Sequence, residues 1–272
     1  MDITDNHFHL DPEGQKEKAV NMFLNSGGTR LVLVHKPYSP WDKIEQFKKQ
    51  VKITLKLSKK ARSAGAKVAV IASPHPVQLI KLLDKFDSKI ASDLYLEAVD
   101  FCTNLVSEHE IVGLGELGRP HFEVDEKIWN LSNKVLQESL IRAKEVDASV
   151  ILHTEEGTPD VMADLSNIAS KASFPKSRLV KHYGGIDSIV NSHGLTVSLL
   201  ASNENIRYAS ENSHDHMLET DYLDDPKRPG AVLGPKTVPR KTLKAFQEGI
   251  IDEEQFSKIH TDLPDFIYKE FS

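Results

Sequence analysis

The sequence has very little cysteine and no long apolar run, and each absence excludes a class of protein. Its single cysteine, Cys102, has no partner for an internal disulfide, which argues against a disulfide-stapled secreted scaffold. The longest apolar runs, such as 31–34 and 67–72, fall far short of the roughly 20 residues that cross a bilayer. The N-terminal residues MDITDNHF lack the basic and apolar parts of a signal peptide. We therefore expect a soluble, cytoplasmic protein with no membrane partner.

An excess of positive charge is also missing. The chain has 34 Lys and Arg against 40 Asp and Glu, which gives a formal net charge of -6. Proteins that hold nucleic acid mainly through its phosphates carry a basic surface. The composition therefore argues against a broad nucleic-acid interface, while a local basic site remains compatible with it.

What the sequence does contain is a regular alternation of short apolar runs with longer helical patterns. The runs are apolar on both faces, which is typical of buried parallel strands. Strands are predicted near 2–7, 30–35, 67–73, 110–116, 148–153, 178–182, 195–201 and 216–221. Helices are predicted over about 44–65, 77–86, 92–108, 125–146, 159–172 and 238–270.

This alternation predicts an α/β fold, a (β/α)₈ TIM barrel with a C-terminal helical segment, in one domain over 1–272. An open doubly wound sheet gives a similar pattern. Cys102 falls in a helical pattern, LEAVDFCTNLV, where a buried core thiol is favoured over a nucleophile. The Pro- and Gly-rich segment 222–241 predicts a long loop at the barrel mouth, and Asp262 is a candidate N-cap before LPDFIY.

Polar side chains end several of the predicted strands. Two histidines, His7 and His9, lie two residues apart on the first strand, so both imidazoles point to one face. A carboxylate, Glu116, interrupts the apolar strand pattern in GLGELG. The other strand-end residues are His153, His182 and Asp221.

Each of these residues has a plain structural alternative, such as a hydrogen-bonded core histidine or a helix cap. In a barrel, however, the carboxyl ends of the strands converge on one cavity. Four imidazoles and two carboxylates are the ligands that borderline divalent metals prefer. Since an isolated buried carboxylate is costly and a metal compensates it, we interpret Glu116 as a metal ligand.

In their order along the chain, these motifs resemble the TatD family of metal-dependent hydrolases within the amidohydrolase superfamily. DNHFHLDP is similar to the family's HxH motif, and ASPHP to its Gly-x-His-Pro segment. GLGELG is similar to its glycine-flanked Glu, and LHTEEG and KHYGG to its later His motifs. MLETDYL, followed by TVPRKT, is similar to its closing acidic motif, so the resemblance spans nearly the whole chain.

The resemblance implies two divalent ions, with Zn, Mn and Mg as candidates, and a role for each motif residue. One ion would be held by His7, His9 and Asp221, with Glu116 bridging to the second. The second ion would take the later histidines, His153 and His182. Two such ions acidify a bridging water, and Asp221 would orient this water and take its proton. Asp221 and Glu116 are thus the catalytic candidates, and His75 would face the substrate.

The resemblance also implies a deoxyribonuclease or phosphodiesterase acting on DNA, but the chain departs from that pattern in two places. Glu155, with Glu156 beside it, stands where such nucleases carry a phosphate-clamping arginine. Arg119, followed by Pro120 and His121, stands where they carry Leu, Asp and aromatic residues. Arg119 could supply the missing cation, or Glu155 and Arg119 could bind a small ester, lactone or amide. A third hypothesis is a metal-binding barrel without catalysis.

Several other polar residues near the predicted mouth admit more than one role, and the sequence leaves the oligomeric state open. His35 ends the second strand and could contact the substrate, whereas His214 and His216 favour local packing over an extra metal site. The loop after Asp221 contains five basic residues, Lys227, Arg228, Lys236, Arg240 and Lys241. They favour a phosphate-bearing ligand, because loops after the last barrel strands often bind phosphate, or they belong to a solvated surface loop.

Overall fold

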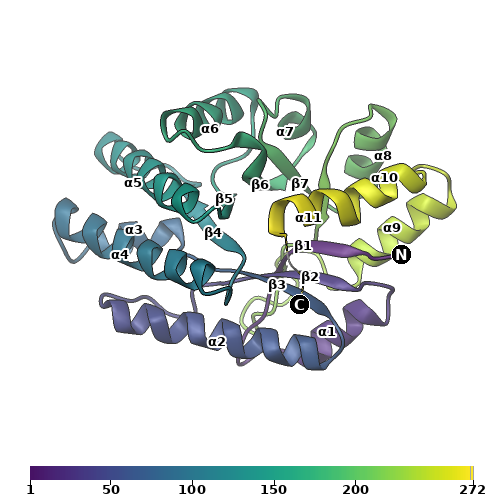
Figure 1. Cartoon of the computed structure of the whole chain (residues 1–272), viewed down its shortest axis with the longest axis horizontal. Coiled ribbons are helices and arrows are strands. Elements are labelled where there is room, and N and C mark those ends of the chain that lie inside the picture. Colours follow the sequence, from purple (N-terminus) through teal and green to yellow (C-terminus); the bar gives the residue numbers. More distant parts are fainter. Residues whose placement is uncertain (270, 272) are drawn as a thin grey trace.

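The computed structural model describes residues 1–269 and 271 and forms a curled parallel sheet surrounded by helices (Figure 1). The strands are β1 Thr4–His9, β2 Arg30–Val34, β3 Lys67–Ile71, β4 Gly113–Gly118, β5 Ser149–His153, β6 Leu179–Gly184, β7 Thr196–Leu200, β8 Met217–Glu219 and β9 Tyr222–Leu223. They are ordered β8-β7-β6-β5-β4-β3-β2-β1-β9, and neighbours pair in parallel. The predicted (β/α)₈ TIM-barrel-like fold is confirmed.

Side chains of β1 join the two ends of this sheet. Asn6 Nδ2 donates to the carbonyl of Leu218 at 3.0 Å. The Asp5 carboxylate accepts from the backbone N–H of Thr220 at 2.9 Å and from its hydroxyl at 2.6 Å. Burial raises the pKa of Asp5 to about 7 although both Thr220 bonds favour its charged form. Because β9 directly follows β8 and pairs with β1, the sheet curls into a barrel and the open doubly wound alternative is wrong.

Helices fill the connections between the strands, as the periodicity predicts. They are α1 Glu17–Leu24, α2 Ile44–Ser63, α3 Pro76–Leu83, α4 Ser88–Ser107, α5 Glu126–Glu145, α6 Pro159–Lys171, α7 Ile186–Val190, α8 Asn203–Glu211, α9 Thr237–Gln247, α10 Glu253–Ser257 and α11 Leu263–Tyr268, with the short turns η1 Lys176–Arg178 and η2 Lys258–Asp262. Helices α1, α7 and α8 were not predicted, because five to nine residues give too few turns for a clear period.

Two boundaries near the C-terminus differ from the sequence prediction. The expected loop over 222–241 is shorter, since Tyr222–Leu223 pair with β1 and α9 begins at Thr237. The helical segment expected over 238–270 is present but divided into α9, α10, η2 and α11, and its last position lies outside the described residues. Asp262 does not cap α11, because the chain is already helical there and its carboxylate accepts from Ser257 Oγ at 3.1 Å.

Helix α11 and η2 cover the end of the barrel at which the strands begin. The end at which the strands finish is therefore left for a site. Ile267 and Tyr268 pack against an apolar cluster inside the barrel that includes Val32 and Met217. On η2, the carbonyl of His260 accepts from Thr4 Oγ1 at 2.6 Å, at the first residue of β1. The polar residues at the carboxyl ends of the strands therefore lie at the opposite end of the barrel from α11 and η2.

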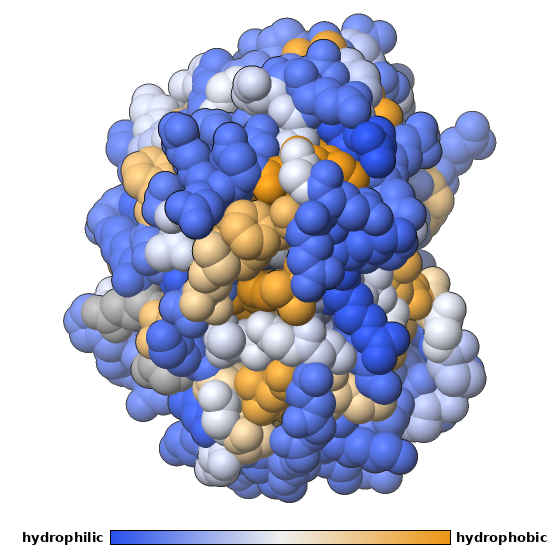
Figure 2. Space-filling model, turned by 90° about the vertical axis from the view of Figure 1, so that its right-hand side faces the viewer, coloured by the Kyte–Doolittle hydropathy of each residue, from blue (hydrophilic) through white to orange (hydrophobic). Residues whose placement is uncertain are grey.

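The outer surface is largely hydrophilic. Figure 2 views the side of the molecule that carries α8, α9 and α10, where apolar residues gather in a band flanked by hydrophilic ones. Within the described residues, none of the helices is long and apolar enough to cross a membrane. Cys102 is fully buried on α4, and burial raises the pKa of its thiol, as expected of a core residue.

Candidate metal centre

The strand-end residues predicted from the sequence meet at one end of the barrel. His7 and His9 lie on β1, and their Nε2 atoms are 3.1 Å apart. Asp221 follows β8, and its Oδ1 lies 3.8 Å from His7 Nε2 and 3.5 Å from His9 Nε2. His9 Nδ1 is 2.9 Å from the carbonyl of Val34, which accepts its proton and leaves a lone pair on Nε2. Three ligand atoms thus surround one point.

Glu116 lies between this group and two histidines from β5 and β6. Its Oε1 is 2.8 Å from His153 Nδ1, 3.0 Å from His182 Nε2 and 3.8 Å from His7 Nε2. Its Oε2 is 3.8 Å from His9 Nε2. Burial works to raise the pKa of Glu116, but His153 and His182 overcome this and hold it well below its usual range. Glu116 is therefore an anion within reach of four imidazoles.

Two glycines on β4 allow Glu116 and His153 to approach each other. A Cβ on Gly115 would lie 2.8 Å from Ile71 Cγ2 and 2.9 Å from Ile151 Cβ inside the barrel. A Cβ on Gly118, whose φ is +149°, would lie 1.9 Å from the carbonyl oxygen of His153. Only glycine therefore fits beside the end of β5.

Replacing Gly118 by Ala is expected to destabilise the fold by about 1 to 3 kcal/mol, the usual range for a strained backbone position. The added methyl group must displace the His153 carbonyl, so divalent-ion affinity should fall as well. Thermal unfolding and metal titration measure both effects. Gly234→Ala is the matched control, since a Cβ there meets nothing within 4 Å. Equal stability of the two variants would contradict the steric argument.

Among the described residues, the donor atoms form three groups of three whose members lie within 4.8 Å of one another. They are His7–His9–Asp221, His7–Glu116–His182 and His75–Glu116–His153. Burial and the nearby imidazole of His182 hold the pKa of His7 well below its usual value, so His7 is a neutral imidazole. Lone pairs that face each other at 3.1 Å repel unless a cation or proton lies between them. Nitrogen and carboxylate donors in this arrangement fit borderline divalent ions.

Glu219 is a buried carboxylate beside the candidate metal centre, and the sequence analysis missed it. It is fully buried on β8, and its Oε1 accepts from the backbone N–H of Tyr183 at 2.7 Å and lies 3.3 Å from His182 Nδ1. It thereby turns His182 Nε2 toward Glu116. In the sequence it lies two residues before Asp221, the same spacing as between His7 and His9, but β8 ends at Glu219 and Asp221 lies beyond it.

Glu219→Gln is expected to lower divalent-ion affinity about 10- to 100-fold, the usual effect of removing a carboxylate behind a histidine ligand. The amide carries no charge to hold the His182 imidazole in place. Competition with a metal-binding dye measures the affinity. The control is Glu248→Gln, at an exposed position just after α9, and the proposal for Glu219 fails if both variants bind the ion equally well.

His75 reaches the centre from the start of α3, but as a different tautomer from His9. Its Nδ1 accepts from the backbone N–H of Val77 at 3.2 Å, which caps the helix and places the proton of the neutral ring on Nε2. Burial lowers the pKa of His75 to about 3, so the ring stays neutral. Although it lies near Glu116 and His153, His75 therefore offers a hydrogen-bond donor.

The structure does not bring the guanidinium of Arg119 to the metal centre. Arg119 is fully buried, and its Nε and Nη2 bind both carboxylate oxygens of Glu155. Its Nη1 bonds to Asn133 Oδ1 at 2.9 Å and to Asp164, and the group lies 4.4 Å from the ring centre of Trp129. Glu155 lines the cavity and Arg119 lies behind it, so Arg119 reaches a substrate only through Glu155.

Two further histidines, His35 and His216, belong to none of the three donor groups. His35 is buried, its Nδ1 lies 2.7 Å from Thr54 Oγ1, and burial with the nearby His9 lowers its pKa to about 3; it is not among the residues that line the cavity. His216 Nδ1 donates to the carbonyl of His214 at 2.8 Å, in line with local packing. Among the described residues that line the cavity, none comes from the basic loop after Asp221.

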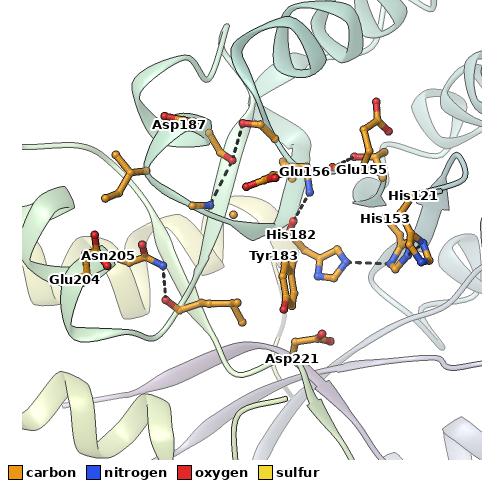
Figure 3. A pocket seen from close by; sticks show the side chains of 18 residues that line it. His121, His153, Glu155, Glu156, His182, Tyr183, Asp187, Glu204, Asn205 and Asp221 are labelled. Carbon is orange, nitrogen blue, oxygen red and sulfur yellow. Dashed lines mark hydrogen bonds between the residues drawn. The ribbon is translucent and has the colours of Figure 1, made fainter. Parts of the chain in front are cut away.

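A cavity of about 770 Å³ opens over the strand ends from β5 to β8. Figure 3 shows His121, His153 and His182 toward one side of it, Asp221 below, and Glu204 and Asn205 on the opposite side. His121, another residue without a predicted role, places its Nδ1 2.9 Å from His153 Nε2. The metal centre therefore forms one end of a substrate-sized chamber.

Comparisons with known proteins agree with this architecture. An uncharacterized protein of Methanocaldococcus jannaschii is 32% identical over 98% of this chain and 96% of its own length. A TatD-like protein from Archaeoglobus fulgidus superposes with a TM-score of 0.66 at 17% identity, covering 97% of this chain and 99% of that one. A PTE-like lactonase variant from Deinococcus radiodurans gives 0.67 at 11% identity, covering 98% and 95%. The sequence profile described as TatD related DNase matches residues 4–269, and the chain belongs to this family.

Proposed function

We propose that the protein is a metal-dependent hydrolase that cleaves an ester bond with two divalent ions. The observation that carries this proposal is the convergence of imidazole nitrogens and two carboxylates at one end of a cavity. One ion would be held by His7, His9 and Asp221, with Glu116 between the two ions. The second would take the remaining histidines, His153 and His182. When bound, such ions acidify water and stabilise negative charge on the reacting oxygens.

Asp221 is the proposed general base. Its side chain is 18% exposed and lines the cavity, whereas Glu116 is 5% exposed and surrounded by histidines. Asp221 therefore meets an attacking water from the cavity side and takes its proton. The same carboxyl group then returns the proton to the leaving oxygen.

His75 is proposed to assist as a donor. Because the Val77 N–H holds its Nδ1 as an acceptor, its Nε2–H is available to the oxygen that gains charge in the transition state. A preoriented neutral donor of this kind stabilises that charge without a proton transfer.

The lining of the cavity supports a small ester, lactone or amide as the substrate. Five of its residues are carboxylates, and the lining residues that the structure describes include one lysine. A lactonase from Deinococcus radiodurans has a barrel of the same fold, which is compatible with such a bond. Cleavage of phosphodiester bonds in DNA is the second candidate, favoured by the description of the family.

Turnover with separately reconstituted Zn, Mn and Mg protein tests the proposal. The substrates are 4-nitrophenyl acetate, a five-membered lactone and an end-labelled single-stranded DNA oligonucleotide. We expect hydrolysis of the ester or lactone that stops with a chelator and returns with the ion. Metal-dependent shortening of DNA alone would support the second candidate, and no metal-dependent turnover of any substrate would contradict the hydrolase.

A further inference from the structure

We propose that His121 is a positioning residue for the metal centre, which holds the imidazole of His153 in the orientation and tautomer that binds the second ion. This inference rests on the proposed two-ion hydrolase, in which that ion takes His153 and His182. His121 lies in the connection from β4 to α5, and its Nδ1 is 2.9 Å from His153 Nε2. Figure 3 shows the two rings beside each other at one side of the cavity.

The two ring nitrogens of His153 face different partners. Its Nδ1 lies 2.8 Å from Glu116 Oε1 and 3.3 Å from His182 Nε2, on the side of the other candidate ligands. Its Nε2 points away from them, toward His121. An ion shared with Glu116 and His182 would therefore bind His153 through Nδ1.

Binding through Nδ1 determines where the proton of His153 lies. A neutral imidazole has one N–H donor and one lone pair, so a lone pair on Nδ1 places the proton on Nε2. Metal-binding histidines usually donate this second ring N–H to a carboxylate, a carbonyl or water, and the bond fixes the tautomer and the orientation of the ring. His121 Nδ1 lies at hydrogen-bond distance and takes the place of these acceptors.

Two other candidate ligands have their own partners behind the ring. His9 Nδ1 donates to a backbone carbonyl of β2 at 2.9 Å, and His182 Nδ1 lies 3.3 Å from the buried Glu219. In the part of the chain that the structure describes, His121 is the hydrogen-bond partner of His153 Nε2. Without His121, the second N–H of His153 would be left to water, and its ring would be free to turn.

The backbone also holds His121 beside His153. The N–H of Arg119 donates to the carbonyl of His153 at 3.2 Å, directly after the close approach at Gly118. Pro120 then restricts the backbone immediately before His121. The two imidazoles meet edge to face, with 4.9 Å between their centres and 75° between their planes. The loop that joins the ends of β4 and β5 thus places the acceptor.

His121 has a different role from the ligands themselves. Among the described residues, none of the groups of three metal-binding donors includes it. Its Nδ1 faces the nitrogen of another imidazole, and a lone pair that accepts a proton there cannot bind an ion as well. Loss of His121 should therefore weaken the ion at His153 and leave the ion at His7, His9 and Asp221.

Metal binding by two variants at position 121 tests this proposal. His121→Phe keeps a flat ring without an acceptor, whereas His121→Asn offers Oδ1 in the position of Nδ1. In competition with a metal-binding dye, His121→Phe should lower the affinity for one of two Zn ions about 10- to 100-fold. His121→Asn should bind both ions as the wild type does. His214→Phe is the control, since His214 is partly exposed and outside the cavity over the metal centre.

A second measurement separates the role in the tautomer from a purely structural role. In Zn-loaded protein with isotope-labelled histidine, long-range proton–nitrogen NMR spectra should show the His153 proton on Nε2. In His121→Phe this N–H signal should vanish through exchange with water. The metal-free forms of wild type and His121→Phe should unfold at the same temperature, because the His121 side chain is exposed.

Equal affinity of wild type and His121→Phe for both ions would overturn the role of His121 and leave the hydrolase standing. A proton on His153 Nδ1 in the Zn-loaded protein, or an equal loss in His121→Asn and His121→Phe, would overturn it too. A third ion that His121→Phe no longer binds would make His121 a ligand instead. If the wild type binds no divalent ion, the proposed hydrolase is wrong, and the role of His121 with it.

Discussion

Asp221→Asn is expected to lower kcat by about 100- to 10,000-fold at saturating metal, the usual range for loss of a general acid–base group. The amide cannot take a proton from water, whereas its oxygen can still approach the histidine pair, as the Oδ1 of Asp221 does at 3.5 Å from His9 Nε2. The variant should therefore keep its ions and lose its chemistry. Initial rates on the best ester substrate, with metal content measured in parallel, test this expectation.

Asp215→Asn is the control for Asp221→Asn. Asp215 is exposed, and its carboxylate pairs with Lys258 at 3.3 Å, outside the cavity over the metal centre. This variant should keep the wild-type rate. If Asp221→Asn retains a kcat within threefold of wild type while holding the same number of ions, another group must take the proton, and the base role of Asp221 is wrong.

Divalent-ion affinity is expected to rise about tenfold per pH unit, for each proton displaced, between pH 6 and pH 8. Burial lowers the pKa of His182, but hydrogen bonds to Glu116 and Glu219 overcome this and raise it to about 10 in the metal-free protein. His182 is therefore protonated over this range, and an ion must displace that proton. Raising the pH removes the competing proton from His182 and therefore strengthens the binding of the ion.

Calorimetric titration with Zn or Mn in two buffers of different ionisation enthalpy measures the number of protons released. We expect at least one proton per protein at pH 7. In Glu219→Gln, the loss of a carboxylate beside His182 Nδ1 should lower the His182 pKa and flatten the pH dependence. Affinity that is independent of pH in the wild type would show that His182 is neutral before the ion binds.

Local sequence patterns predicted the alternating strands and helices and the polar residues at the strand ends, but left both a barrel and an open doubly wound sheet possible. Strands buried on both faces must be apolar throughout, so a polar residue at their end stands out, as Glu116 and His182 do. Spacing of two on a strand fixes a shared face, which is why His7 and His9 approach within 3.1 Å. Helices of 20 residues, such as α2 and α5, show enough turns for their period to be recognised.

Only the tertiary structure decided which charged and polar groups meet. Arg119 and Glu155 are 36 residues apart, and the sequence could not indicate that they bind each other behind the cavity wall. His35 likewise ends a strand but is enclosed by Thr54 and its neighbours, because α2 covers that side of β2. The hydrophobic period of a helix or strand indicates which of its faces is buried. Which side chains then bind each other depends on the directions in which side chains from several elements point. The residues of the candidate metal centre could thus be predicted from the sequence, whereas the cavity beside it and the residues that line it could not.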